Sequence, residues 1–320
     1  MLYFKIVKIL ITSSSRKIPL IRAVKLAALK VNPKSVIIAG DSIDAVISKS
    51  YMDNFWLMPE SLDKNLKLLI DGCIDRKINI IIPTRDGELF FWSKNLKKFR
   101  DVGIQIIVSS FEAIKICLDK QLFFEFGNNN NLPFITTSLS IDKLSSIRSL
   151  VVKERHGSSS KEIGINLDFM AAKRYAKNLN EPIFQPYVVG EEFSADAWVD
   201  NDNLVKGIVL RKRMLVENGE SVITETFQDK AIELLIEKVL FLLKLKGPVM
   251  IQGIIDDQMM IHIIECNARF GGASTCSISA GLDSFYWSIL EAYGYDLAQY
   301  PFAQDFNTIR QIRIPFDIYQ

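Results

Sequence analysis

Over about the first 110 residues, short and continuously apolar runs alternate with segments whose apolar residues recur at helical spacing. Parallel strands have this uninterrupted apolar character because they are buried on both faces and are joined by long, usually helical, crossovers. The pattern therefore predicts βαβ units and a doubly wound parallel α/β sheet. The predicted strands are residues 5–12, 35–40, 54–58, 78–84 and 104–108.

Ligands of open parallel sheets bind beyond the carboxyl ends of the strands. In this sequence those ends carry the serine-rich residues 12–15, the pair 40–41 (Gly-Asp) and residues 83–87 (Pro-Thr-Arg-Asp-Gly). The loop after the first strand contains no GxGxxG sequence. A dinucleotide cofactor is therefore not predicted there.

From about residue 150 the predicted strands lie closer together and alternate between apolar and polar residues. This alternation is typical of antiparallel sheets with one solvated face. Helices are predicted at about 168–179, 228–244 and 276–293. The predicted architecture is thus an α/β part followed by an α+β part.

The charges of the chain nearly cancel, with 39 lysines and arginines against 37 aspartates and glutamates. Neither nucleic acid nor a membrane is predicted as a partner, because a formal charge of +2 gives no broad attractive field. Four separated cysteines without a CxxC pair are typical of reduced thiols in a cytoplasmic protein. The N-terminal run contains Lys5 and Lys8 and is predicted to be a strand, not a signal peptide.

A β-hairpin is predicted around residues 256–258, where Asp-Asp-Gln separates two apolar runs. In this hairpin Gln252 falls roughly opposite Glu265, and Asn267 projects from the same face as Glu265. Three convergent oxygen donors, two of them neutral, suit Mg²⁺, which takes its other ligands from water and substrate phosphates. The alternative interpretation is an ordinary hairpin whose carboxylate pairs with Arg269.

A second candidate is the small-residue loop 156–164, which follows an apolar run that contains Lys153. Small side chains let backbone N–H groups approach an anion, and a lysine supplies a point charge for phosphate. The loop is not a Walker A loop, because no GKS or GKT sequence follows. A surface loop with solvated charges is the alternative interpretation.

A third candidate lies in residues 184–194, where a short glycine-containing turn joins two predicted strands. The hairpin brings Gln185 and Glu192 near one edge. Extended backbone can pair with the edge of a purine, and a carboxylate accepts hydrogen bonds from ribose hydroxyls. A plain hairpin with a polar turn is the alternative.

In their order and spacing, these three stretches resemble the ATP-grasp superfamily over nearly the whole chain. The intervals of 13 residues from Gln252 to Glu265 and 2 from Glu265 to Asn267 are similar to its metal triad, nearest the carbamoyl-phosphate-synthase large-subunit-like group. The resemblance implies an α/β Rossmann-like (pre-ATP-grasp) domain followed by two α+β ATP-grasp subdomains. The implied boundaries are residues 1–112 for the first domain, 113–184 for the small lid subdomain and 185–320 for the C-terminal subdomain with the metal site.

The resemblance also implies ATP and Mg²⁺, or Mn²⁺ in its place, as cofactors. Lys120 and Lys153 would contact phosphates, and residues 156–164 would form a flexible lid over them. Gln185 would meet the adenine amino group, and Glu192 would hold the ribose hydroxyls. The other implied nucleotide contacts are Pro186, Tyr187 and Val188 in the link between strands and Ser158, Ser159 and Ser160 in the lid.

By the same resemblance, Glu265 would bridge two Mg²⁺ ions, and Gln252 and Asn267 would each complete one site. Catalytic roles are implied for Lys153 and for two arginines. Arg269 would contact the transferring phosphoryl group or the acyl intermediate. Arg211 would reach the γ-phosphate or a substrate carboxylate, with a solvated strand end as its alternative. Two residues keep open roles: Arg213 and His156.

The implied function is an ATP-dependent carboxylate–amine ligase that works through an acyl phosphate. Its partners would be a small carboxylate and a small amine, and a homodimer is an open alternative to a monomer. One other function is a carbamoyl-phosphate-synthase-like or carboxylase-like enzyme that forms carboxyphosphate. A third, from a different class, is a catalytically inactive nucleotide-binding regulatory protein.

Overall fold

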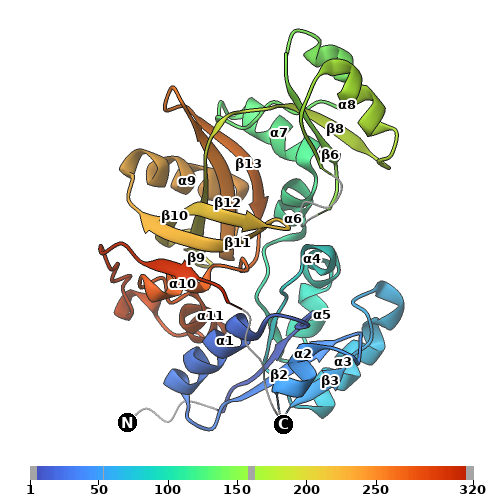
Figure 1. Ribbon diagram of the computed structural model, residues 1–320. Coiled ribbons are helices and arrows are strands. Elements are labelled where there is room, and N and C mark those ends of the chain that lie inside the picture. Colours follow the sequence, from blue (N-terminus) through green and yellow to red (C-terminus); the bar gives the residue numbers. More distant parts are fainter. Residues whose placement is uncertain (1–5, 53, 158–162, 315–320) are drawn as a thin grey trace.

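The computed structural model describes residues 6–52, 54–157 and 163–314. Figure 1 shows a parallel α/β sheet at one end, a small antiparallel sheet at the other, and a large antiparallel sheet between them. The predicted fold class, an α/β part followed by two α+β parts, is confirmed.

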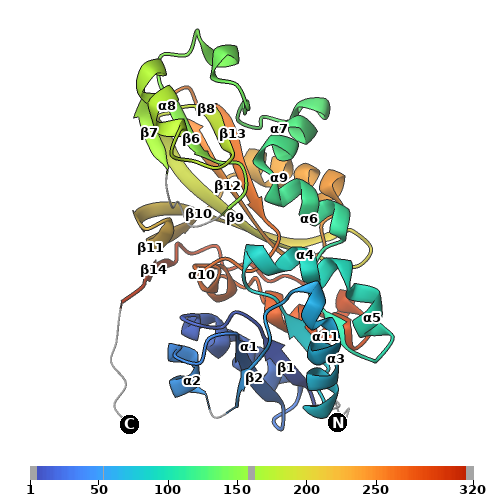
Figure 2. The ribbon, with the colours of Figure 1, turned by 90° about the vertical axis from the view of Figure 1, so that its right-hand side faces the viewer.

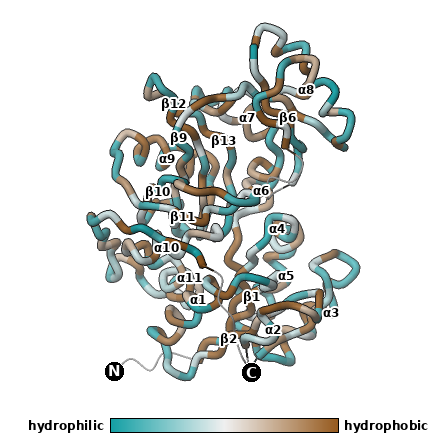
Figure 3. The backbone as a smooth tube through the Cα atoms, viewed as in Figure 1, coloured by the Kyte–Doolittle hydropathy of each residue, from teal (hydrophilic) through white to brown (hydrophobic). Residues whose placement is uncertain are grey.

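In the described chain, the N-terminal sheet has the strand order β3-β2-β1-β4-β5, and every pair in it is parallel. The five predicted strands form this sheet, and the hydrophobic residues along its strands stand out in Figure 3. Its strands are β1 (Lys8–Ile11), β2 (Val36–Asp41), β3 (Phe55–Leu57), β4 (Ile80–Ile82) and β5 (Gln105–Ile106). Its helices are α1 (Ile18–Val31), α2 (Ile47–Tyr51), α3 (Leu66–Asp75), α4 (Asp86–Lys94) and α5 (Leu96–Arg100), with a 3₁₀ turn η1 (Asp63–Asn65).

Two helices lead from this domain to the small sheet, which has the antiparallel order β7-β6-β8. Figure 2 shows the small sheet at the end of the molecule far from the N-terminal sheet. The elements here are α6 (Phe111–Leu118), α7 (Lys120–Asn129), η2 (Ile141–Leu144), β6 (Leu150–Glu154), β7 (Gly164–Leu167), α8 (Phe169–Ala176) and β8 (Pro182–Pro186).

The large sheet has the order β13-β12-β9-β10-β11-β14 among the described residues, and its strand pairs are antiparallel. The alternation of the sequence after residue 150 is thus explained. Its strands are β9 (Gly190–Val199), β10 (Val205–Glu217), β11 (Glu220–Phe227), β12 (Gly247–Asp256), β13 (Ile261–Asn267) and β14 (Arg310–Ile312). The accompanying helices are α9 (Lys230–Leu243), α10 (Thr275–Ser279), α11 (Ser284–Ala292) and η3 (Leu297–Gln299).

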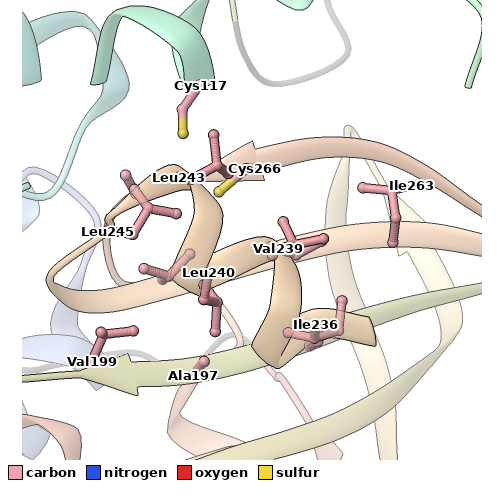
Figure 4. Close-up of a cluster of buried hydrophobic side chains, with 14 of the residues drawn as sticks. Cys117, Ala197, Val199, Ile236, Val239, Leu240, Leu243, Leu245, Ile263 and Cys266 are labelled. Carbon is pink, nitrogen blue, oxygen red and sulfur yellow. The ribbon is translucent and has the colours of Figure 1, made fainter. Parts of the chain in front are cut away.

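One face of the large sheet is apolar and is covered by α9 and α6. Figure 4 shows the side chains of α9 packed on Ala197 and Val199 of β9 and beside Ile263 of β13. Cys117 of α6 and Cys266 of β13 lie in the same cluster. All four cysteines are buried and free, as predicted. The polar residues of these strands are therefore left on the opposite face.

The single helix predicted at 276–293 is wrong, because the structure has α10 and α11 there instead. Gly281 lies between them at φ +97°, a conformation that L side chains rarely adopt. A Cβ at this position would lie 2.1 Å from the carbonyl oxygen of Ala303. The close approach of this backbone segment breaks the helix in two.

The break lets α11 pack against α1 of the N-terminal domain, as Figure 1 shows. Phe285 of α11 stacks on Phe270 with ring centroids 3.7 Å apart, and both belong to the hydrophobic cluster of the N-terminal sheet. Lys30 at the end of α1 forms an exposed ion pair with Asp283 at 2.5 Å. The segment after β13 therefore ties the large sheet to the first domain.

None of the helices in the described part of the chain combines the length and the apolar character that a membrane span requires.

Candidate active site

The polar face of the large sheet gathers side chains from four adjacent strands in one row. Glu265 of β13 pairs with Gln252 of β12, Gln252 pairs with Ser194 of β9, and Ser194 pairs with Arg211 of β10. Directly paired residues of antiparallel strands share a face of the sheet. The predicted hairpin and its register are confirmed, and the predicted metal residues start this row.

Gln252, Glu265 and Asn267, predicted to hold a metal, are in contact with one another. The Asn267 amide donates to Glu265 Oε1 at 3.1 Å. With its amide nitrogen oriented toward Glu265, Gln252 donates to Oε1 at 2.7 Å and accepts from Arg213 at 2.6 Å. The structure thus places two side-chain amides beside one carboxylate, each donating a hydrogen bond to it.

The three residues predicted to hold a metal carry only one negative charge between them, that of Glu265. Among the described residues, no group of three or more histidine, cysteine, aspartate or glutamate side chains is arranged to hold a metal ion. One carboxylate and two amides do fit Mg²⁺, which is commonly bound through one or two carboxylates together with substrate phosphates. The residues therefore suit a metal that arrives with a phosphate ligand.

Lys153 of β6 lies within electrostatic range of Glu265. Burial lowers the pKa of Lys153 to about 8, the Glu265 carboxylate opposes this shift, and the neighbouring Lys120 ammonium adds to it. Burial also lowers the pKa of Lys120, and Glu265 again opposes the shift. Glu265 is thus the carboxylate that acts on both lysines, while Asp86, Asp119 and Glu154 also act on Lys120 and Glu192 also acts on Lys153.

Lys120 begins α7, and its position is fixed by the loop that it faces. Its ammonium donates to the carbonyl oxygen of Gly157 at 3.0 Å. The preceding Asp119 caps α7 and forms a bidentate ion pair with Arg155 at 2.9 and 2.6 Å. Sequence reasoning missed Asp119, although an aspartate directly before a helix is a known capping signal.

Arg269 does not pair with Glu265, so the alternative interpretation of the hairpin is wrong. Its guanidinium forms a bidentate ion pair with Asp86, with Nε to Oδ1 at 2.7 Å. The same guanidinium donates to Asn267 Oδ1 at 3.2 Å. Arg269 therefore joins the residues predicted to hold a metal to α4 of the N-terminal domain, a contact that sequence reasoning missed.

Arg211 is buried and already paired within the protein, which does not fit a contact with the γ-phosphate or with a substrate carboxylate. Its side chain is 1% exposed and pairs with Asp196, with Nε to Oδ2 at 2.6 Å. Its other nitrogens contact Thr224 and the sulfur of Met250. The alternative interpretation, in which Arg211 is a solvated residue at the end of a strand, is also wrong, because the side chain is buried. Because arginine tolerates burial only with full pairing, this geometry gives Arg211 a structural role.

Arg213, whose role was open, lies two residues further on β10 and on the same face of the sheet. It contacts Gln252 as described above and donates to Glu192 Oε2 at 3.0 Å. Its side chain is 8% exposed, whereas that of Glu192 is 51% exposed. Arg213 thus connects the metal residues to the carboxylate predicted to hold a ribose.

The residues predicted to contact adenine lie where the small sheet meets the large one. Gln185 of β8 is buried, and its amide donates to Thr137 Oγ1 at 2.8 Å. Pro186 ends β8, and the backbone N–H of Tyr187 donates to Ser149 at 2.9 Å. In the described chain, the backbone N–H of Val188 has no acceptor.

The predicted lid is described only at its ends. His156 is exposed and lies 3.4 Å from Glu181. Gly157 has a φ of +128°, which favours glycine. The predicted phosphate contacts Ser158, Ser159 and Ser160 lie outside the described residues.

We expect Gln252→Glu to lower the Mg²⁺ concentration needed for turnover, because a second carboxylate strengthens an oxygen-ligand site. Release of product should slow as the ion is held more tightly. The measurement is a Mg²⁺ titration of phosphate release. Gln258→Glu in the exposed turn of the same hairpin adds the same charge and is the control. Equal titrations for wild type and Gln252→Glu would show that Gln252 is not a ligand.

Two family models match the chain. Residues 9–107 match the PylC-like N-terminal domain, and residues 178–313 match a model described as ATP-grasp in the biosynthetic pathway with Ter operon. No curated protein matches the sequence.

Solved structures resemble nearly the whole chain. One is the biotin carboxylase domain of Hydrogenobacter thermophilus 2-oxoglutarate carboxylase, solved with MgADP and bicarbonate. It is 16% identical in sequence with a TM-score of 0.75, and the match covers 93% of this chain and 72% of that chain. N5-carboxyaminoimidazole synthetase from Staphylococcus aureus with ADP is 18% identical with a TM-score of 0.72, covering 91% and 78%. L-amino acid ligase from Bacillus licheniformis is 14% identical with a TM-score of 0.68, covering 90% and 74%. At these identities the likeness shows the fold.

Proposed function

We propose that this chain, a member of the ATP-grasp superfamily, is an ATP-dependent carboxylate–amine ligase for small molecules. One observation carries the proposal. Glu265 lies between two amide side chains of the large sheet and close enough to Lys120 and Lys153 to affect the pKa of both. A carboxylate for Mg²⁺ and two cations for phosphate are what phosphoryl transfer requires of a protein.

In this proposal Gln252, Glu265 and Asn267 hold Mg²⁺, which supplies neutralisation of the phosphate charge when it is bound with ATP. Lys120 and Lys153 position the phosphates from the opposite side. Such a site accelerates phosphoryl transfer by positioning and charge stabilisation and needs no side-chain nucleophile.

The proposed reaction has two steps. A carboxylate oxygen of the acid attacks the γ-phosphorus of ATP, the bond from that phosphorus to the β–γ bridging oxygen breaks, and ADP leaves. The amine nitrogen then attacks the acyl carbon, the carbon–oxygen bond to the phosphoryl group breaks, and the amine loses a proton. Arg269, which contacts Asn267, lies where it can neutralise the acyl phosphate.

For the nucleotide base, we propose the link between the two sheets as the binding segment. The amide oxygen of Gln185 is an acceptor for an adenine edge, and the backbone N–H of Val188, which has no acceptor among the described residues, is a donor. Pro186 and Tyr187 would line the base, and Glu192, held by Arg213, would accept from the ribose hydroxyls. The lid contacts of residues 158–160 stay predictions.

We also propose domain boundaries that respect the observed elements. The predicted boundary at 112/113 cuts α6, and the one at 184/185 cuts β8. Ser110 caps α6, and Gly190 begins β9, so boundaries at 109/110 and 189/190 leave both elements whole. The homodimer and the cytoplasmic location stay predictions.

The proposed function is tested by phosphate release from Mg-ATP with panels of small acids and amines. Release that needs both an acid and an amine, with formation of an amide, supports ligation. Release that needs bicarbonate, the anion bound in the Hydrogenobacter thermophilus structure, supports a carboxyphosphate-forming enzyme. Binding of Mg-ATP without turnover under any condition would support a regulatory protein and contradict the proposal.

We expect the affinity for Mg-ATP to fall as the pH rises through about 8. Lys153 is a cation below its pKa of about 8 and loses its charge above it, and bound phosphate favours the charged form. The loss should approach about tenfold per pH unit above pH 8, because a one-unit pKa shift is worth 1.36 kcal/mol. Calorimetric titrations from pH 7 to 9.5 measure it. Lys153→Arg, which keeps its charge, should remove most of this dependence, and an unchanged slope would contradict the role of Lys153.

A further inference from the structure

The parallel sheet of the N-terminal domain has a single point where its strand order reverses, among the described strands. The chain runs from β1 to β2 and β3 on one side of the sheet and then returns to β4 and β5 on the other. Ligands of open α/β sheets bind in the crevice outside the carboxyl ends of the two strands at such a point. Here those strands are β1 and β4, and the proposed nucleotide residues do not occupy this place.

Lys17 and Thr84 bridge the two strand ends. Lys17 follows β1, and its ammonium donates to the carbonyl oxygen of Thr84 and to Thr84 Oγ1, the latter at 2.8 Å. Thr84 follows β4, and its hydroxyl donates to the carbonyl oxygen of Thr12 at 2.5 Å. An ammonium has three donors, and Thr84 is its only acceptor in the described chain. Lys17 is partly exposed, and one of its three N–H donors has no acceptor among the described residues.

The ammonium of Lys17 forms no ion pair with a carboxylate among the described residues, although charged side chains lie around it. Arg269 and Arg85 are cations that act on Lys17, and Asp86 and Glu88 are the opposing carboxylates. Asp86 is already paired with Arg269. Glu88 accepts from the backbone N–H groups of residues 84 and 85 at 2.9 and 3.1 Å. Burial, followed by Arg269, lowers the pKa of Lys17 to about 8.

This cationic position is connected to the proposed reaction centre. Arg269, which acts on Lys17, donates to Asn267 Oδ1 at 3.2 Å, and Asn267 contacts Glu265. Arg269 is therefore the residue through which the end of the N-terminal sheet and the proposed metal residues are linked.

We infer that Lys17 and Thr84 form the subsite for the carboxylate of the acid substrate. The inference rests on the proposed function. A carboxylate would accept a hydrogen bond from the free N–H of Lys17, whose ammonium has no carboxylate partner among the described residues. The N-terminal domain thereby selects a small carboxylic acid, and the large and small sheets bind the nucleotide.

The test measures protection of Lys17 from chemical modification. Acetylation by limiting acetic anhydride is followed by mass spectrometry in the presence of Mg-ADP, with panels of small carboxylic acids, including amino acids, and their primary amides. At least one acid should slow the acetylation of Lys17 several-fold, and its amide should not. Lys25, an exposed lysine of α1, the helix that begins directly after Lys17, should react equally in every case.

Kinetics then separate the inference from the proposed function. Lys17→Met should raise the KM for the acid at least about tenfold, the value of one charged hydrogen bond, and leave the Kd for Mg-ADP unchanged. Lys17→Arg should recover part of the loss, and Lys25→Met should behave as wild type. Protection of Lys17 without turnover would support the subsite and contradict ligation. Turnover without protection, or no protection by any acid, would overturn the subsite.

Discussion

Glu265→Ala should abolish turnover, with a loss of at least about 10³-fold in kcat. Metal-assisted stabilisation of transition-state charge is worth several kcal/mol, and each 1.36 kcal/mol is a factor of ten in rate. Glu265 is the one carboxylate among the three proposed metal residues, and neither Gln252 nor Asn267 can replace its charge. The measurement is phosphate release at saturating Mg-ATP.

Binding of ADP without metal should survive this substitution, because Lys120 and Lys153 lose only their shared counter-charge. Asp257→Ala is the matched control, since it removes an exposed carboxylate from the turn of the same hairpin. Near wild-type phosphate release by Glu265→Ala would contradict the assignment of Glu265 as a metal ligand. Loss of activity in Asp257→Ala as well would show that the hairpin had been disturbed in both variants.

Arg211→Met should destabilise the folded protein by about 3–5 kcal/mol, because it leaves a buried carboxylate without its counter-charge. Asp196 would keep only the hydroxyls of Ser274 and Ser277, at 2.6 and 2.5 Å. Urea denaturation followed by circular dichroism measures the loss.

Arg310→Met is the control for this stability loss. Arg310 pairs with Glu225 on the same sheet but is 58% exposed, and exposed pairs are worth about 0–1 kcal/mol. If Arg211→Met lost activity without losing stability, Arg211 would act on the substrate, as the sequence predicted, and its structural role would be wrong.

The fold was largely predictable because its signals are local. Continuous apolar runs identified the parallel strands, and alternation identified the antiparallel ones. The hairpin register followed from one turn sequence, and it brought Gln252, Glu265 and Asn267 together as expected. The break between α10 and α11 was missed, because it depends on the approach of Ala303 to Gly281, 22 residues away in sequence.

The charge partners were much harder to predict. Arg269 pairs with Asp86, which lies 183 residues earlier, and no local pattern connects them. Arg211 and Arg213 lie two residues apart on β10 and share a face of the sheet. Even so, Arg211 is buried against Asp196, whereas Arg213 contacts Gln252. Sequence spacing gives the face of a strand, and only the packing of neighbouring strands decides which side chain is buried.

The central claim, activation of a carboxylate by ATP, is tested most directly with an acid labelled with ¹⁸O in its carboxylate. If an acyl phosphate forms, the phosphate that leaves carries one oxygen from the acid, and mass spectrometry should find one ¹⁸O in each phosphate released. The label should appear only when Mg-ATP, the acid and the amine are all present. Unlabelled phosphate from the labelled acid, with ¹⁸O entering instead from labelled water, would contradict the account, because ATP would then be hydrolysed without activating the acid.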